Sequence, residues 1–194
     1  MKHLIVLSGA ALLLNVFGAS TVSAQSKDEL IAQAVRPLPP DLKAGATVFD
    51  YDSATGERKI LRQGSNFVEC QPKQKDGFTR CWDKVTAGRR DFQAKLRAQG
   101  KSDKEVQEAT AAATTAGTIK ATPYGTMSYR YSDDPSRIQL LWVMSVPGGT
   151  PESVGVSTGS QRDAALKGHG LPWLMLPGTP GAHIMIPINN VPVD

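Results

Sequence analysis

Cys70 and Cys81 are the only two cysteines of this 194-residue chain, and ten mostly polar residues separate them. Two thiols allow a single pairing, and an oxidising compartment favours its formation. The intervening residues include Pro72 and Gly77, which are typical of a surface loop between strands. A redox-active or metal-binding pair is disfavoured, because the sequence has neither a Cys-x-x-Cys spacing nor a histidine nearby. We therefore expect a structural disulfide that fixes two segments side by side.

The first 24 residues have the pattern of a secretory signal peptide. A positive start at Lys2 precedes an apolar run over residues 4–17, and small or tolerated residues occupy positions 22–24 before the expected cleavage point. The apolar run is too short to span a bilayer comfortably, and no later stretch approaches 18 continuous apolar residues. We expect a mature chain of residues 25–194 that is periplasmic or secreted and has no membrane span.

The charge of the mature chain does not indicate a nucleic-acid partner. The formal net charge is +4, and removal of Lys2 lowers it to +3. Acidic and apolar residues interrupt the basic cluster, and no aromatic ladder accompanies it, so we interpret it as a solvated helix face. The cluster comprises Arg89, Arg90, Lys95, Arg97 and Lys101.

Three strands are predicted in series, at residues 46–51, 57–62 and 66–71. Turn-forming residues at 52–57 and 63–66 separate them, and consecutive strands with short turns usually pair antiparallel. A helix over residues 26–35, with Ser26 as its cap and Glu29 three residues on as in a capping box, and an extended proline-containing stretch form a lead-in over residues 25–44.

A helical hairpin is predicted next, because Asp83 can cap a helix that ends at Gly100 and Ser102 with Glu105 forms a capping box for a second. A half-buried strand follows at 125–131, where apolar and polar residues alternate, and the most apolar stretch of the mature chain, 138–146, predicts a central strand. The segment 168–187 contains a last strand pair. The fold class is therefore α+β, with an antiparallel sheet, a meander plus C-terminal strands, and the helical hairpin inserted between the sheet halves. A single domain is expected over residues 45–190.

Four residues form a candidate pocket: Trp173, His183, His169 and Asp134. The two histidines are 14 residues apart in the last segment, so a hairpin can bring them together with Asp133, Asp134 or Asp163 for metal binding or hydrolysis. Asp133 and Asp134 also fit a plain turn, and each histidine also fits a structural position. Ser157 matches the letters of Gly-x-Ser-x-Gly but lacks the strand and helix around it, so no catalytic residue is assigned.

The sequence resembles a family of uncharacterised exported bacterial proteins. The residues that carry the resemblance are Gly45-Ala46-Thr47-Val48, Leu61-Arg62-x-Gly64-x-Asn66 before Cys70, Cys81-x-Asp83, Pro172-Trp173, and Pro180-Gly181-Ala182-His183-Ile184-Met185. The resemblance implies export and a single domain, and it implies no activity for any residue.

Two functional hypotheses follow. The first is a non-catalytic exported domain that binds a ligand or a protein partner or is associated with the cell envelope, because no nucleophile, base and orienting group stand together in the sequence. The alternative is a hydrolase or metal-dependent enzyme that uses His183 and His169. Neither a resident metal nor a cofactor is predicted.

Overall fold

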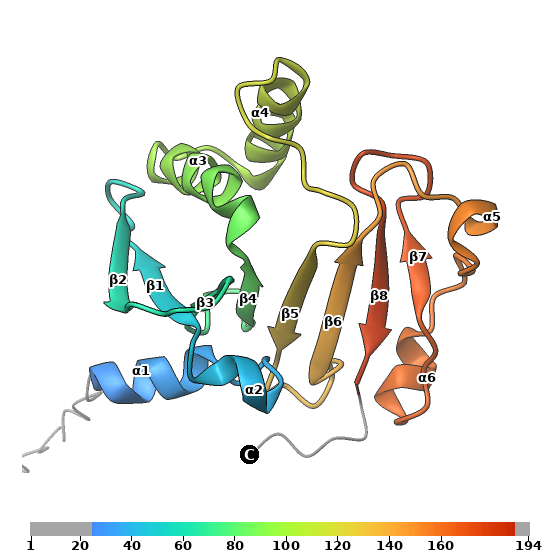
Figure 1. Cartoon of the computed structure of the whole chain (residues 1–194), viewed down its shortest axis with the longest axis horizontal. Helices are drawn as coiled ribbons and strands as arrows, with labels where there is room; N and C mark the ends of the chain where they lie inside the picture. The colour runs from blue at the N-terminus through green and yellow to red at the C-terminus, as the bar shows by residue number, and fades with distance from the viewer. Residues whose placement is uncertain (1–24, 189–194) are drawn as a thin grey trace, which may run out of the picture.

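A computed structural model of the chain describes residues 25–188, so the predicted signal peptide lies outside the described part. Within it, helices and one eight-stranded sheet form an α+β fold with strand order β2-β1-β3-β4-β5-β6-β8-β7 (Figure 1). The strands are β1 (Thr47–Tyr51), β2 (Arg58–Arg62), β3 (Val68–Gln71), β4 (Thr79–Asp83), β5 (Met127–Tyr131), β6 (Leu140–Ser145), β7 (Trp173–Met175) and β8 (His183–Pro187). The helices are α1 (Lys27–Ala34), α2 (Pro40–Lys43), the 3-10 helix η1 (Lys84–Thr86), α3 (Ala87–Ala98), α4 (Asp103–Thr115), α5 (Pro151–Val154) and α6 (Arg162–Leu166). Of these described helices, none is both long enough and apolar enough to cross a bilayer.

The first three strands do not form the expected meander. β3 does not pair with β2. It pairs with β1 in parallel, with Thr47 opposite Glu69 and Val48 opposite Cys70. The other pairings in the sheet are antiparallel. The connection between β2 and β3 passes the beginning of β1, where the amides of Ser65 and Asn66 donate to the carbonyl of Gly45 at 2.8 and 2.9 Å. These bonds give partners to the amides of the segment that crosses β1. Because β1 pairs with β2 on one side and with β3 on the other, it is an interior strand.

Gly64 lies where this crossing is tightest. Its amide donates to Thr47 Oγ1 at 3.1 Å, and a Cβ atom added to it would overlap the backbone of Gly45, Ala46 and Thr47. Backbone atoms cannot move aside as a flexible side chain does. The position therefore requires glycine for close approach.

We expect Gly64→Ala to lower the free energy of unfolding by about 1–3 kcal/mol or more, the usual cost of overpacking. Urea denaturation followed by circular dichroism measures the change. Gly88→Ala is the matched control, because no atom lies within 4 Å of its added Cβ and alanine is favoured over glycine in a helix by about 1 kcal/mol. If the free energy of unfolding of Gly64→Ala is no lower than that of Gly88→Ala, glycine is not required at position 64.

The lead-in packs onto the sheet. α1 begins at Ser26 with the predicted capping box to Glu29, whereas the proline-containing stretch, expected to be extended, includes α2 with Pro40 at its first position. Trp142 Nε1 donates to the carbonyl of Pro37 at 3.3 Å. Residues 25–44 thus help to cover the first core cluster, to which Ala34, Val35 and Leu38 belong.

Cys70 and Cys81 form the predicted disulfide, with an S–S distance of 2.02 Å. They lie directly opposite each other on β3 and β4, and both are fully buried in the first core cluster. The bond therefore joins two paired strands inside the core. Because successive residues of a strand point to opposite faces, Cys70 faces α1 and Glu69 faces α3. α1 and α3 thus cover opposite faces of this part of the sheet.

The helical hairpin is confirmed between β4 and β5. Asp83 caps η1 by accepting from the amide of Val85 at 2.8 Å, and Ser102 with Glu105 forms the capping box of α4. The buried residues of α3 are Arg90 and Ala94. The expectation that the basic side of this hairpin lies in water is therefore wrong for Arg90, whose ion pair with Glu69 on β3 turns its guanidinium inward.

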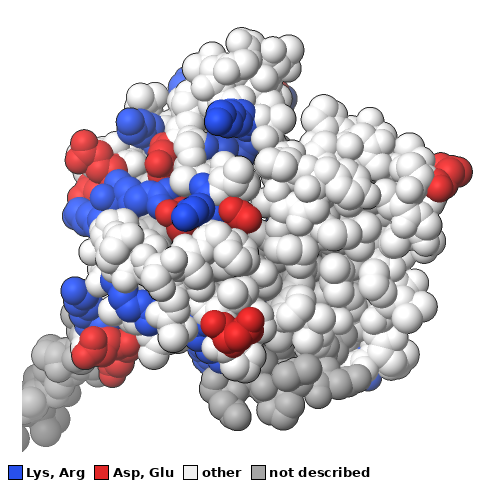
Figure 2. Space-filling view, viewed as in Figure 1, with Lys and Arg blue, Asp and Glu red and all other residues white. Residues whose placement is uncertain are grey.

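The C-terminal strands follow the prediction, with β6 in the interior of the sheet and β7 paired antiparallel with β8 at one edge. Charged side chains are unevenly distributed. On the face drawn in Figure 2 they gather over β1–β4 and α3, while the half formed by β6–β8 is almost uncharged. Residues 138–188 contain four Lys, Arg, Asp or Glu residues, namely Glu152, Arg162, Asp163 and Lys167.

Candidate functional site

Trp173, the aromatic residue of the predicted pocket, is a core residue. It is 5% exposed and packs with Leu141, Val143 and Met185 in the second core cluster. In β7 it lies opposite Met185 of β8. Its ring therefore packs in the core, as large aromatic side chains commonly do.

The predicted polar residues do not meet around one cavity. His183 pairs with Ser145 at one end of β6, whereas Asp134 lies in the turn before the other end, which begins at Leu140. Five residues of strand separate these ends by about 16 Å. Asp134 instead caps its own turn through Ser136 and forms an ion pair with Arg137 at 3.3 Å.

The two histidines make local contacts only. His183 Nδ1 lies 2.8 Å from the carbonyl of Gly181, and His169 Nδ1 lies 3.2 Å from that of Lys167. In residues 25–188, no group of three or more His, Cys, Asp or Glu side chains is arranged to hold a metal ion. Ser157 is exposed between α5 and α6 and does not follow a strand, so it lacks the setting of a nucleophile elbow.

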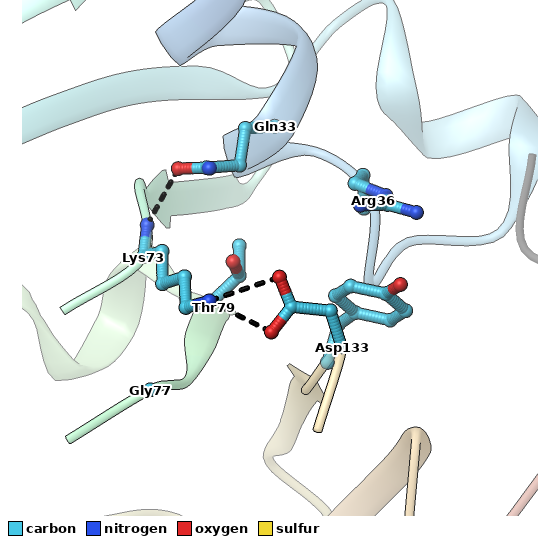
Figure 3. Close-up of a pocket in the computed structure, with 7 residues that line it drawn as sticks. Gln33, Arg36, Lys73, Gly77, Thr79 and Asp133 are labelled. Atoms are coloured by element: carbon cyan, nitrogen blue, oxygen red, sulfur yellow. Dashed lines mark hydrogen bonds and ion pairs between the residues drawn. The ribbon is translucent and has the colours of Figure 1, made fainter. Parts of the chain in front are cut away.

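A small polar cavity lies between the end of α1, β4 and the end of β5 (Figure 3). Lys73 closes one side of it, since its amide donates to Gln33 Oε1 at 3.0 Å and its Nζ donates to both oxygens of Asp133 at 2.7 and 2.9 Å. Arg36 lies over the ring of Tyr131, 4.3 Å from its centroid. The volume of about 10 Å³ admits at most one water molecule. This cavity therefore belongs to the joint between α1 and the sheet.

A larger pocket of about 230 Å³ lies where η1 and the start of α3 face the chain that returns from α4 to β5. η1 follows directly from the cap at Asp83, and Gly88 leaves the opening free because it has no side chain. On the other side, Gly117 ends α4 with a φ of +74°, and the amides of Thr118 and Ile119 bond back to Ala113. The residues that line the pocket are Val85, Thr86, Gly88, Arg89, Thr118, Ile119, Lys120, Ala121 and Thr122.

The charge of this pocket has one sign. Its lining contains two cationic side chains, Arg89 and Lys120, together with three threonines and no carboxylate. Arg89 Nη2 donates to Thr114 Oγ1 at 3.0 Å, but its Nε is buried without a hydrogen-bond partner. Burial lowers the pKa of Arg89 from its ordinary value, because it disfavours the charged form. The pocket thus offers donors and positive charge to an anion.

A buried ionic network holds α3 above the sheet next to this pocket. Glu69 pairs with Arg90 of α3 and, at 2.8 Å, with Arg58 of β2, and these three side chains are 8–17% exposed. Asp91 accepts from Arg58 at 2.8 Å and from the hydroxyl of Tyr51 at 2.7 Å. Burial and the hydrogen bond to Asp91 raise the pKa of Tyr51 above its ordinary value. The network fixes the position of α3 and hence of Arg89.

The residues of the larger pocket were not singled out as a site from the sequence. The available signal was the pair Arg89-Arg90 shortly after the helix cap Asp83, where Arg89 faces the pocket and Arg90 turns inward. Comparison with protein-family models, with curated proteins and with solved structures found no match.

Proposed function

We propose that this protein is an exported, non-catalytic binding protein that holds a small organic anion in the pocket between η1, α3 and residues 118–122. The observation that carries the proposal is the charge of the lining. Arg89 and Lys120 face a pocket of about 230 Å³ with no carboxylate among its lining residues. A guanidinium recognises carboxylate and phosphate groups through charge-assisted hydrogen bonds.

The unpaired Nε of Arg89 supports an anion as the ligand. A buried donor without a partner costs about 1–3 kcal/mol, and more when the group is charged. An oxyanion bound beside the guanidinium of Arg89 would compensate its partly buried charge, and the hydroxyls of Thr86, Thr118 and Thr122 can donate further hydrogen bonds. Binding of an anion would therefore complete an arrangement that the protein alone leaves unsatisfied.

The size and the apolar part of the lining support a small organic molecule. Pockets for drug-sized ligands usually measure about 300–1,000 Å³, so this pocket fits a smaller one. Val85 is 48% exposed at the pocket, and Ile119 and Ala121 add apolar surface. A ligand with one anionic group and a short apolar body would contact both kinds of surface.

Export is supported by the signal-peptide pattern of residues 1–24 and by the disulfide, a bond that persists in the periplasm and outside the cell. The enzyme alternative receives no such support, because the rings of His169 and His183 bond only to carbonyls near them in the chain. We therefore propose that the protein acts as a binding protein in the periplasm or the medium.

Thermal unfolding with three probes tests the proposal: phenyl phosphate, benzoate, and the neutral benzyl alcohol. A ligand present at 100 times its Kd stabilises the native state by about 2.7 kcal/mol, so at least one anion should raise Tm saturably while benzyl alcohol should not. The double variant Arg89→Met/Lys120→Met should lose this shift.

The matched control is Arg97→Met/Lys104→Met, which makes the same change in net charge on side chains that are 54% and 86% exposed. It should keep the shift. Equal shifts in both double variants would show that the anions act on the overall charge, and no saturable shift with either anion would reject the pocket as their binding site.

A further inference from the structure

Arg130, like Arg89, has a buried Nε without a hydrogen-bond partner, and it lies far from the pocket. It sits near the end of β5, whereas residues 118–122 precede the start of that strand. In the described part of the chain, Arg130 takes part in no ion pair, and its Nε is buried without a hydrogen-bond partner. Among the described carboxylates, Asp76 favours the charged form of Arg130 only from beyond ion-pair distance.

The neighbour of Arg130 across the strands is also an arginine. Arg130 pairs with Arg80 of β4, so the two side chains share one face of the sheet, where like charges repel. Burial, and then Arg80, lower the pKa of Arg130. Two like charges side by side, one of them partly buried, are unfavourable unless an anion joins them.

The carboxylates close to this pair are already engaged. Asp76 holds Arg80 through two hydrogen bonds of 3.0 and 2.6 Å, and Asp134 pairs with Arg137 at 3.3 Å. Arg137 joins the cluster because its Nη1 donates to the carbonyl of Asp76 at 2.8 Å. Three guanidinium groups therefore face two carboxylates, which leaves an excess of one positive charge.

The ring of Phe78 helps to hold these guanidinium groups in place. Arg137 lies 4.5 Å and Arg80 4.9 Å from its centroid, distances typical of cation–π contacts. Phe78 belongs to the loop that connects β3 to β4. The pairing of these two strands and the disulfide between them hold both ends of this loop. The donors of the cluster are thus ordered before any ligand binds, which reduces the entropy lost on binding.

We propose that Arg130, with Arg80 beside it and Arg137 at the rim, forms a second binding site that takes an oxyanion group, either a phosphate or a carboxylate. The planar guanidinium of Arg130 suits two parallel hydrogen bonds to such a group. A bound oxyanion supplies the negative charge that forms an ion pair with Arg130. The site does not depend on the larger pocket, because it shares no residue with it.

The test follows the side-chain Nε–Hε signals of arginine by NMR during titration with inorganic phosphate and, separately, with acetate. Sodium chloride keeps the ionic strength constant. The signal of Arg130 should shift saturably with at least one anion, and the anion with the lower Kd identifies the preferred group. Arg130→Lys should bind at least tenfold more weakly, since it keeps the charge but loses the planar fork.

Arg130→Met separates binding from folding. In chloride its Tm should equal or exceed that of the wild type, because an uncompensated buried charge is replaced by an apolar side chain. The stabilisation of the wild type by the preferred anion should be absent in Arg130→Met and retained in Arg97→Met. A lower Tm of Arg130→Met in chloride, a retained anion effect in this variant, or a linear drift of the Arg130 signal without saturation would each overturn the proposal.

Discussion

Glu69→Ala is expected to lower the free energy of unfolding by about 3–5 kcal/mol, the cost of breaking a buried ion pair by removing one partner. The Glu69 side chain is 14% exposed and bridges two guanidinium groups, those of Arg58 and Arg90. Its removal leaves Arg90, at 8% side-chain exposure, beside aromatic rings and without its carboxylate. Urea denaturation monitored by tryptophan fluorescence measures the loss.

Two further variants test the cause of this loss. Asp103→Ala removes a carboxylate that is 84% exposed and lies 3.5 Å from Arg97, so its effect should stay below about 1 kcal/mol. Replacing Arg58, Glu69 and Arg90 together by Met, Leu and Met should restore much of the stability, because the charge that loses its partner is then Asp91, which is 40% exposed and keeps the hydrogen bond from Tyr51. Equal losses of unfolding free energy in Glu69→Ala and Asp103→Ala would show that water screens the charges of the network.

Glu69→Ala also tests whether the ionic network supports ligand binding. Arg89 and Arg90 are consecutive in α3, so their side chains point in directions about 100° apart around the helix axis. Arg90 reaches the sheet, and Arg89 reaches the pocket. Since the ionic network holds α3 in place, Glu69→Ala should weaken the binding of an anion in the pocket even though Glu69 does not line it.

Local features of the fold could be predicted from the sequence because their causes are local. The capping boxes at Ser26 and Ser102 are each complete within four residues, and the structure contains both. The alternation of residues 125–131 predicted β5, and the apolar run at 138–146 predicted the interior strand β6. The pairing of the disulfide followed from the count of cysteines, and its formation from the expected export.

The order of the first strands depends on contacts that a local pattern does not contain. A short turn before β3 predicts pairing with β2, yet Gly64 crosses the backbone of β1, 17 residues earlier in the chain. The lack of a side chain at Gly64 permits this approach. In the sequence, the same glycine is equally typical of a hairpin turn.

The candidate site depended on long-range contacts as well. Arg90 pairs with a glutamate 21 residues away, and the two sides of the larger pocket are separated in the chain by α3 and α4. His169 and His183 drew attention because they are the only histidines after residue 24, the end of the predicted signal peptide. Residue type identified them, but strand register, which the sequence did not specify, places His183 and Asp134 at opposite ends of β6.

Removal of the disulfide is expected to lower the free energy of unfolding by about 3 kcal/mol, because the bond restricts the unfolded chain by closing a loop of about ten residues. The double variant Cys70→Ala/Cys81→Ala tests this value without leaving a reactive thiol. Both positions are fully buried between β1, α1 and β5, so the loss of sulfur also removes core contacts. The midpoint of urea denaturation should fall accordingly.

Dithiothreitol provides the internal control for the disulfide. In the wild type, reduction should reproduce most of the loss, because it breaks the same bond, and two free thiols need more room in the core than the disulfide does. In Cys70→Ala/Cys81→Ala, dithiothreitol should have no effect on the midpoint. If reduction leaves the wild type unchanged, and mass spectrometry confirms that the bond is broken, the stability of the β3–β4 pair comes from its flanking strands β1 and β5, and the cross-link contributes little.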